Sequence, residues 1–525
     1  MAFNKAAEEL FRVQNWGARD AFVAILSAWC TYWVTVGIYR VYFSPLAKFP
    51  GPKLAALTFW YEFYYEIYPH SYQYLWKIKA LHEQYGPIIR ISPYHIHVND
   101  VNFFDKIYAA GNHKRNRDPW FSHSSPKSWA GAMLEAIDHD LHKMRRSAVS
   151  NFFSKRSVQA LEPLVIDKAK RLVERLKEDG ANGRVVNCNN AMAGMTMDVI
   201  SAYCFGESMN ALSKSEYGKQ WLDILHQGVQ IRPIARQFPT IMNFLLDLPP
   251  KTVAKMNPAV AMMNSFNESL INKISKIKEN LDAGVEEKSE YGHRTIFHEM
   301  FESTVLREEE KLPFRMMGDA SVFLGAGTET TARTLSVTIY YLLTQKRCGD
   351  KLRAELRTVL PSKDTKVTLP QLEALPYLTA TINEGLRVAH GVTSRHFRIA
   401  TEEDLQYQQY TIPRGTPVAE SLYLLNTDEK TWPEPFKFRP ERFIETPEVR
   451  KRLVSFGGGS RNCLGMNLAV SELYFALAYL FRELEMEVVD TIEEKDVMTS
   501  HDCFIGMSDL GSEGIKIKIL GEVKD

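Results

Sequence analysis

The sequence contains few cysteines, and they do not occur in close pairs. Isolated cysteines argue against a disulfide framework and against a Cys-x-x-Cys metal site. We therefore expect the bulk of the chain to lie in a reducing compartment. The sequon at residues 267–269 is expected to stay unmodified, because it matters only in a lumen and such short motifs recur by chance. The six cysteines are Cys30, Cys188, Cys204, Cys348, Cys463 and Cys503.

An excess of charge of one sign is also missing. Lysine and arginine total 64 against 63 aspartates and glutamates, which gives a net charge of +1. A surface that binds nucleic acid carries a clear basic excess, so we do not expect nucleic acid as a partner. The 525 residues are 45% hydrophobic, which is enough for a large core. The sequence lacks internal repeats and long low-complexity linkers, which favours one large domain over several small ones.

Charged residues are absent from one long segment near the N-terminus. Residues 21–39 contain no charge and lie between Asp20 and Arg40, a length that suits a helix across a hydrocarbon core of about 30 Å. A cleaved signal peptide is the alternative, but its apolar core is usually about 7–15 residues long and a small-residue cleavage site should follow. We therefore predict a short tail over residues 1–20 and one uncleaved transmembrane anchor over residues 21–39. Basic residues are balanced on its two sides, so their count does not determine the orientation.

Prolines follow the predicted anchor. The fixed φ angles and missing N–H donors of Pro50 and Pro52 stop a helix. The sequence therefore predicts a stiff elbow over residues 40–53 and a main body over residues 54–525.

The body shows helical patterns over most of its length. Apolar residues recur every three or four positions, over stretches longer than strands reach, at 158–177, 191–205, 259–281, 314–344 and 464–484. Short alternating runs predict a hairpin formed by 87–92 and 95–98, and two further strands at 409–412 and 514–520. The expected fold class is mainly α with a minor β-sheet region. The acidic run at 308–310 is expected to be a solvated approach to a helix.

One cysteine lies in a glycine-rich setting. The stretch FGGGSRNCLG at 456–465 places Cys463 at the start of a predicted helix, where the helix dipole and free N–H groups lower the pKa of a thiol. Three glycines allow close approach to a flat ligand, and Arg461 can hold a carboxylate with two hydrogen bonds. A lone cysteine is more often a small buried hydrophobe, and a glycine-rich run can also cradle a phosphate. A thiolate and a carboxylate clamp on one loop suit iron protoporphyrin.

This stretch resembles the haem-binding signature F-x-x-G-x-R-x-C-x-G of the cytochrome P-450 family at every defined position: Phe456, Gly459, Arg461, Cys463 and Gly465. The resemblance implies the cytochrome P-450 fold and a haem b cofactor whose iron is bound by the Cys463 thiolate. It covers nearly the whole chain. The sequence resembles in particular fungal microsomal members of secondary metabolism, such as trichothecene-type terpenoid oxygenases.

A second family motif precedes the cysteine loop. Glu384-Gly385-Leu386-Arg387 matches E-x-x-R, whose spacing puts both charges on one helix face. The stretch at 438–443 resembles the family's PERF element, which would bring Arg442 to this pair. The resemblance implies a buried triad of Glu384, Arg387 and Arg442 that braces the cysteine loop. Taken alone, the E-x-x-R spacing is common in surface ion pairs.

Further basic residues match positions that contact the haem propionates in the family. Arg398 stands where the family usually has such an arginine. His142 and Arg146 lie four residues apart on one face of a predicted helix and resemble the residues that grip the propionates from the other side. The family often has tryptophan where this chain has His142. Without the resemblance, each of these residues is more simply a surface residue.

The predicted helix at 314–344 contains the run LGAGTETT at 324–331. Glycine costs about 1 kcal/mol relative to alanine inside a helix, so something other than helix stability selects this run. A site for a diatomic ligand needs close backbone approach, a local widening of the helix and a proton relay. The run resembles the family's A-G-x-[DE]-T-T element, which implies that Glu329 belongs to a proton-delivery route and that Thr330 hydrogen-bonds the oxygen species. The simpler alternative is close helix packing through small residues.

The resemblance implies a monooxygenase that inserts one atom of O₂ into an apolar small molecule, by hydroxylation or epoxidation. Electrons would come from NADPH through a separate flavoprotein reductase, with cytochrome b5 as a further candidate donor. The expected location is the endoplasmic reticulum membrane, with the catalytic domain facing the cytosol. Two alternatives stay open: a haem-thiolate isomerase or dehydratase that does not use O₂, and a non-catalytic membrane haem protein. Glu329 beside Thr330 argues against the isomerase.

Mostly apolar segments are expected to line the substrate pocket. They lie at 129–133, 231–244, 322–326, 392–394 and 504–505. The candidates for a reductase-docking face, for which solvated surface is the simpler explanation, are Lys143, Arg145, Lys451 and Arg452.

Overall fold

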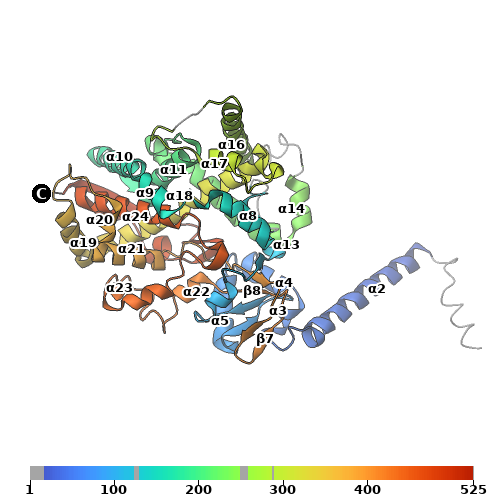
Figure 1. The fold of residues 1–525 in the computed structure, drawn as a ribbon. Coiled ribbons are helices and arrows are strands. Elements are labelled where there is room, and N and C mark those ends of the chain that lie inside the picture. Colours follow the sequence, from blue (N-terminus) through green and yellow to red (C-terminus); the bar gives the residue numbers. More distant parts are fainter. Residues whose placement is uncertain are drawn as a thin grey trace, which may run out of the picture.

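The computed structural model describes residues 17–122, 129, 131–246, 248, 258–285 and 289–523. One helix, α2 (Ala18–Ile38), continues as a π-helical turn over Tyr39–Phe43 and points away from the body (Figure 1). Its side chains are mostly exposed. Among the described residues, Ala18–Phe43 is the one helix long and apolar enough to cross a membrane. The helix therefore extends beyond residues 21–39 at both ends.

The segment after this helix is packed tightly on the body. Arg90 Nη1 donates to the Arg40 carbonyl over 2.7 Å, and the Arg90 backbone N–H donates to the Pro50 carbonyl over 2.7 Å. Gly51 has a φ of +144°, and a side chain there would overlap the Arg90 carbonyl oxygen. Residues 40–43 of the predicted elbow are helical, so the irregular part begins at Ser44.

The body is mainly helical, which confirms the predicted fold class. Its central helix is α18 (Pro313–Thr344), which is buried over most of its 32 residues. It packs against α11 (Cys188–Phe205), α16 (Pro258–Asp282), α21 (Pro376–Val388) and α24 (Met466–Glu483).

One long predicted helix is two helices in the structure. The chain at 158–177 forms the end of α9 (Lys155–Ala160) and most of α10 (Glu162–Ala181). Pro163 lies in the first turn of α10. Proline has no N–H to donate, so it starts a helix more readily than it continues one.

The other helices surround this centre. They are α3 (Lys53–Leu57), α4 (Trp60–Glu66), α5 (Tyr74–Tyr85), α6 (Phe104–Ile107), α7 (Pro119–Ser122), α8 (His139–Ser150), α12 (Lys219–Gln230), α13 (Arg232–Gln237), α14 (Pro239–Leu246), α17 (Ile296–Glu302), α19 (Lys346–Val359), α20 (Leu369–Glu373), α22 (Leu422–Asn426) and α23 (Arg442–Glu445).

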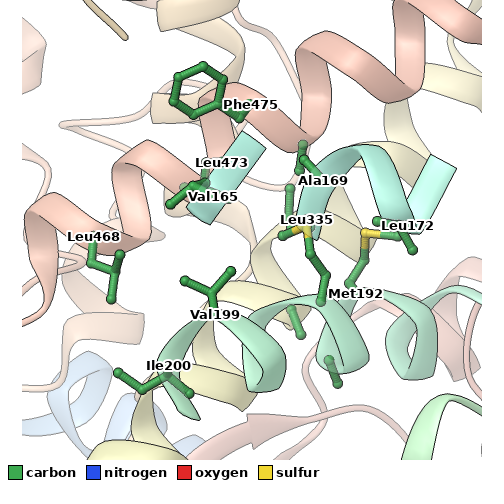
Figure 2. Close-up of a cluster of buried hydrophobic side chains, with 14 of the residues drawn as sticks. Val165, Ala169, Leu172, Met192, Val199, Ile200, Leu335, Leu468, Leu473 and Phe475 are labelled. Carbon is green, nitrogen blue, oxygen red and sulfur yellow. The ribbon is translucent and has the colours of Figure 1, made fainter. Parts of the chain in front are cut away.

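Figure 2 shows part of the core where α10, α11, α18 and α24 meet. Val165 and Leu172 of α10 are fully buried, as are Met192 of α11, Leu335 of α18 and Phe475 of α24. Burying an aliphatic or aromatic side chain of this size stabilises a fold by roughly 1.5–3 kcal/mol. This core fixes α18 relative to α24, the helix that follows the cysteine loop.

The sheets are small. The five-stranded sheet has the order β1-β2-β8-β5-β3, and β4-β12-β9 form a second sheet. The predicted hairpin is confirmed as the antiparallel pair β1 and β2, and the two further predicted strands as β7 and β12. The strands are β1 (Ile88–Arg90), β2 (Ile96–Val98), β3 (Arg115–Arg117), β4 (Val185–Asn187), β5 (Arg398–Ala400), β6 (Leu405–Tyr407), β7 (Tyr410–Ile412), β8 (Pro417–Ala419), β9 (Leu484–Val489), β10 (His501–Cys503), β11 (Ile505–Met507) and β12 (Lys516–Glu522).

Candidate functional site

The cysteine loop, residues 456–465, is packed against the segment that follows α6. Gly459 has a φ of +68°, and a side chain there would overlap the backbone carbonyls of Tyr108 and Ala109. A side chain on Gly458 would overlap the ring of Phe104. The Ser460 N–H donates to the Ala109 carbonyl over 3.1 Å. The glycines therefore serve close contact between two parts of the protein.

Cys463 lies in this loop, with its side chain exposed. Its backbone N–H donates to the Phe456 carbonyl over 2.9 Å, which closes the loop. Desolvation by the surrounding protein raises the pKa of the thiol. The Gly465 N–H and the Arg146 guanidinium oppose this effect. The Gly465 N–H thus acts on this pKa in the predicted direction, and α24 starts at Met466, three residues after Cys463.

Basic side chains gather beside the cysteine loop. Arg461 donates to the carbonyls of residues 136–138, and its Nε is buried without a hydrogen-bond partner. Arg398, in β5, donates to the Phe397 carbonyl over 3.0 Å. Burial and the neighbouring Arg398 and Arg117 lower the pKa of Arg461 to about 8, and burial lowers that of Arg398 to about 10. Cations that depress one another's pKa values in a buried site favour an anionic ligand.

Two residues of α8 reach the same region. Burial and the nearby Arg461 lower the pKa of His142 to about 2, so this imidazole is neutral, and its Nδ1 is buried without a hydrogen-bond partner. Arg146 donates to the Asn462 carbonyl over 2.8 Å and to the Asn462 Oδ1 over 2.7 Å. In this structure Arg146 therefore braces the residue before Cys463. Arg117 is a member of this cluster that the sequence analysis missed, because two arginines in a three-residue strand form no recognisable motif.

The three charged residues Glu384, Arg387 and Arg442 lie together. Arg387 donates to both carboxylate oxygens of Glu384 over 2.8 Å, and Arg442 Nε lies 3.1 Å from Glu384 Oε1. Glu384 and Arg387 are completely buried. Arg387 also donates to the Asn426 carbonyl, and the Asn426 side-chain amide donates to Ser455, immediately before the cysteine loop. The triad is thus connected to that loop by hydrogen bonds.

The run at 324–331 lies within α18. A side chain on Gly325 would lie 3.1 Å from Leu225 of α12, and one on Gly327 would lie 3.0 Å from Ile200 of α11. Helix packing therefore accounts for both glycines. Thr330 Oγ1 donates to the Ala326 carbonyl over 2.8 Å. The expected widening of the helix is not observed, because α18 is α-helical throughout.

Glu329 is buried and lies next to Thr330 on α18. Its Oε1 is 3.2 Å from Nε2 of His226 on α12, an ion-pair distance. His226 was not recognised from the sequence, because a single histidine in an amphipathic helix carries no signal of its partner. Thr330 also approaches the segment after α21, since a side chain on Gly391 would lie 3.9 Å from its Cβ.

The predicted pocket segments fall into three groups. Trp129, Leu324 and Gly325 line an apolar cavity between α12, α16 and α18. Thr393 and Ser394 are instead buried, and both hydroxyls donate to Asp502 over 2.8 and 2.9 Å.

The third group, residues 231–244, was predicted to line the pocket, and this prediction is wrong for residues of α14. Ile241 and Phe244 of α14 are 58% and 65% exposed, and α14 lies at the periphery of the body (Figure 1). By contrast, Arg232 is buried over the ring of Phe504, with its guanidinium carbon 4.5 Å from the ring centre. Residue 130 lies outside the described residues.

Two charged residues that were predicted to lie on the surface, Arg145 and Glu310, form a buried ion pair. Arg145 donates to both carboxylate oxygens of Glu310 over 2.8 and 2.9 Å, and each side chain is only 10% exposed. Arg315 lies 2.7 Å from the same carboxylate. The prediction of a fully solvated acidic run is therefore wrong at Glu310, and Arg145 is not free to dock a partner. Lys143, Lys451 and Arg452 are exposed.

Known proteins resemble this chain over almost its full length. The sequence model of cytochrome P450 matches residues 50–511. The cytochrome P450 monooxygenase ucsK of Acremonium sp is 39% identical over 505 residues, which cover 93% of this chain and 95% of that protein. The cytochrome P450 monooxygenase TRI4 of Trichoderma arundinaceum is 34% identical, covering 92% of each chain. The stellatic acid synthase of Emericella variicolor is 35% identical, covering 94% of each chain. With the cysteine loop, the buried triad and the fold in agreement, the chain belongs to the cytochrome P450 family, whose members bind haem through a cysteine thiolate and act as monooxygenases.

Proposed function

We propose that this chain inserts one atom of O₂ into an apolar small molecule of fungal secondary metabolism, by hydroxylation or epoxidation, with Cys463 as the ligand of the haem iron. The observation that carries the proposal is an accessible thiol beside a cluster of buried cations. A thiolate ligand donates electron density that favours O–O cleavage. The relatives are fungal monooxygenases, which supports the same reaction class.

The residues around Cys463 fit haem. Arg461 has a buried Nε without a hydrogen-bond partner, and His142 has a buried Nδ1 in the same state. Together with Arg398, they form a site that favours anions, as the carboxylates of haem are. We assign Arg461, Arg398 and His142 to the propionates, and Arg146 to the support of the loop. Phe456, Gly459 and Gly465 would shape the loop that presents Cys463 to the haem.

Glu329 and Thr330 are proposed to deliver protons on the other side of the site. Glu329 is a buried carboxylate that can carry a proton, and the Thr330 hydroxyl beside it can both donate and accept a hydrogen bond. A haem isomerase has no need of such a pair, so the pair favours the monooxygenase.

We further propose that the electrons come from NADPH through a separate NADPH–cytochrome P450 reductase, with cytochrome b5 as a second donor. Lys143 in α8 and Lys451 near the cysteine loop are exposed, so they can contribute to a docking face. Both lie close in sequence to residues that contact the loop. Arg145 is left out because Glu310 binds it.

The proposed location is the endoplasmic reticulum membrane, with residues 21–39 in the bilayer and the body, residues 54–525, in the cytosol. An apolar surface next to the anchor supports this orientation of the body. Trp60 of α4 is 55% exposed, and its ring lies 6.1 Å from that of Phe238, between α13 and α14. Figure 1 shows α3, α4 and α13 on the side of the body from which α2 leaves. Exposed apolar residues beside an anchor favour contact with lipid.

The substrate is proposed to enter the cavity between α12, α16 and α18. Its lining is mostly apolar, and Asn267 and Ser321 are two polar side chains in it. Such a lining favours an apolar ligand that carries few polar groups.

The test uses the full-length protein with a reductase. We expect the reduced, carbon-monoxide-treated protein to show the red-shifted Soret band of the family, and Cys463→Ser to lose it. Cys30→Ser, in the anchor, is the matched control and should keep the band. A Cys463→Ser variant with an unchanged band would contradict the assignment. NADPH consumption that depends on reductase and on an added apolar substrate would exclude the isomerase and the non-catalytic haem protein.

A further inference from the structure

Helix α12 approaches α18 closely at one glycine. A side chain at Gly325 would lie 3.1 Å from Leu225 Cδ2, tighter than an ordinary contact. Glu329 follows Gly325 by four residues and therefore lies on the same face of α18. His226 follows Leu225 and reaches Glu329, with 3.2 Å between His226 Nε2 and Glu329 Oε1. The close contact at Gly325 therefore lies beside the point where the two charged groups meet.

Other charged groups face this pair, but they do not replace it. Arg333, one turn beyond Glu329, uses its guanidinium to bond the Ala389 carbonyl, the Val497 carbonyl and the Thr499 hydroxyl. Asp223, one turn before His226, is exposed. Burial and, more weakly, Arg333 lower the pKa of His226, but the Glu329 carboxylate and, more weakly, Asp223 raise it, and the net shift is upward. A buried carboxylate needs a partner of opposite charge, and His226 is close enough to be that partner.

The pair lies at the edge of the apolar cavity. Leu225 and Gly325, the neighbours that bring α12 onto α18, both line it. A ligand in the cavity therefore contacts the same helix junction that holds His226 against Glu329.

We propose that His226 is a positioning residue for Glu329, which makes proton delivery at the site depend on the docking of α12 over the substrate cavity. This inference rests on the proposed function. When His226 holds Glu329 in place, O₂ takes up two electrons and two protons, one oxygen atom is inserted into a C–H or C=C bond of the substrate, and the other leaves as water. When Glu329 is not held, two electrons and two protons leave with O₂ as hydrogen peroxide.

The first test compares His226→Gln with Gln227→Ala. Gln227 is the exposed neighbour on α12 and provides the matched control. We expect His226→Gln to keep the Soret band, to raise the share of electrons lost as peroxide several-fold, and to lower product formation about tenfold. Loss of a general acid itself costs about 10²-fold or more. Equal peroxide yields in the wild type and His226→Gln would overturn the proposal.

A second test separates positioning from a general effect on structure. In a Glu329→Gln background, His226→Gln should change the peroxide yield no further, because the two residues act as one unit. Effects that simply add would contradict the proposal. A wild-type protein without the Soret band or without NADPH consumption would instead mean that the proposed function fails.

A third readout does not depend on turnover. The pKa of His226 is raised in the folded protein, so the stability it contributes is present below its ordinary value near 6.5 and is lost as pH rises through the raised value. His226→Gln should therefore lower the melting temperature at about pH 6 and have little effect at about pH 9. A difference that does not change with pH would contradict an ion pair with Glu329.

Discussion

The cysteine loop and the junction of α12 with α18 are held in different ways. Next to the loop, Glu384 accepts hydrogen bonds from Arg387 and Arg442, and Gly459 of the loop packs closely against the backbone of Tyr108 and Ala109. At the junction, Leu225 packs closely on Gly325, and His226 lies at ion-pair distance from Glu329. The loop is fixed by several hydrogen bonds to buried groups, whereas the contact at the junction involves the flexible end of the Leu225 side chain.

The largest expected effect comes from the triad. In Glu384→Gln the fully buried Arg387 loses its counter-charge, and removing one partner of a buried ion pair costs about 3–5 kcal/mol. We expect loss of most of the haem-loaded protein, measured as the Soret band per milligram together with the melting temperature. Glu445→Gln is the control, because its ion pair with Arg439 is about half exposed. Similar losses in both variants would show that the triad has no special role.

The next effect distinguishes two loop glycines with the same backbone conformation. Gly457 and Gly459 both have a φ of +68°, but only a side chain on Gly459 would overlap protein atoms. Gly457→Ala should cost about 1–2 kcal/mol through the left-handed backbone alone. Gly459→Ala should cost more and also reduce haem loading, since the loop must move away from Tyr108. Equal unfolding free energies of the two variants would show that the loop is looser than its packing indicates.

A smaller effect is expected on α18. Alanine in place of a helical glycine gains up to about 1 kcal/mol, and overpacking costs about 1–3 kcal/mol. At Gly325 the neighbour is the end of the Leu225 side chain, which can move, so Gly325→Ala should change stability little. At Gly327 the neighbour is the β-branched Ile200, whose Cβ would lie 3.3 Å away, so Gly327→Ala should be the less stable variant. Chemical unfolding of both variants tests this order, and the reverse order would contradict it.

The sequence predicted the cysteine side of the site better than the oxygen side, because the cysteine side depends on local spacing. Glu384 and Arg387 are three residues apart on one helix, so their pairing can be read along the chain. Whether Gly325 and Gly327 serve an oxygen ligand or helix packing could not be decided from spacing, since the answer depends on Leu225 and Ile200 of other helices.

Long-range contacts account for what the sequence did not predict. His226 meets Glu329 across more than a hundred residues of chain, and no periodic pattern marks such a pair. Glu310 stands in an acidic run that is typical of a solvated segment, yet Arg145 and Arg315 bind it. The apolar residues of α14 could not be placed from composition alone, because a pocket lining and an exposed apolar surface contain the same types of residue.

The smallest effect concerns His390, which lies between the two regions. It is buried, and burial together with Arg387 and Arg333 holds its pKa well below the ordinary value of 6.5. The neutral imidazole is therefore compatible with the fold above pH 6.5, and stability is lost as pH falls below that value, by at most about 1.4 kcal/mol per pH unit. Asparagine tolerates the φ of +48° at this position, so His390→Asn should fold and should lose less stability between about pH 7.5 and about pH 5.5 than the wild type. Thermal unfolding at both pH values measures this difference, with His70→Asn as the exposed control. An unchanged acid dependence in His390→Asn would mean that the region between the triad and α18 admits water, and that the cysteine side is less rigid than its hydrogen bonds indicate.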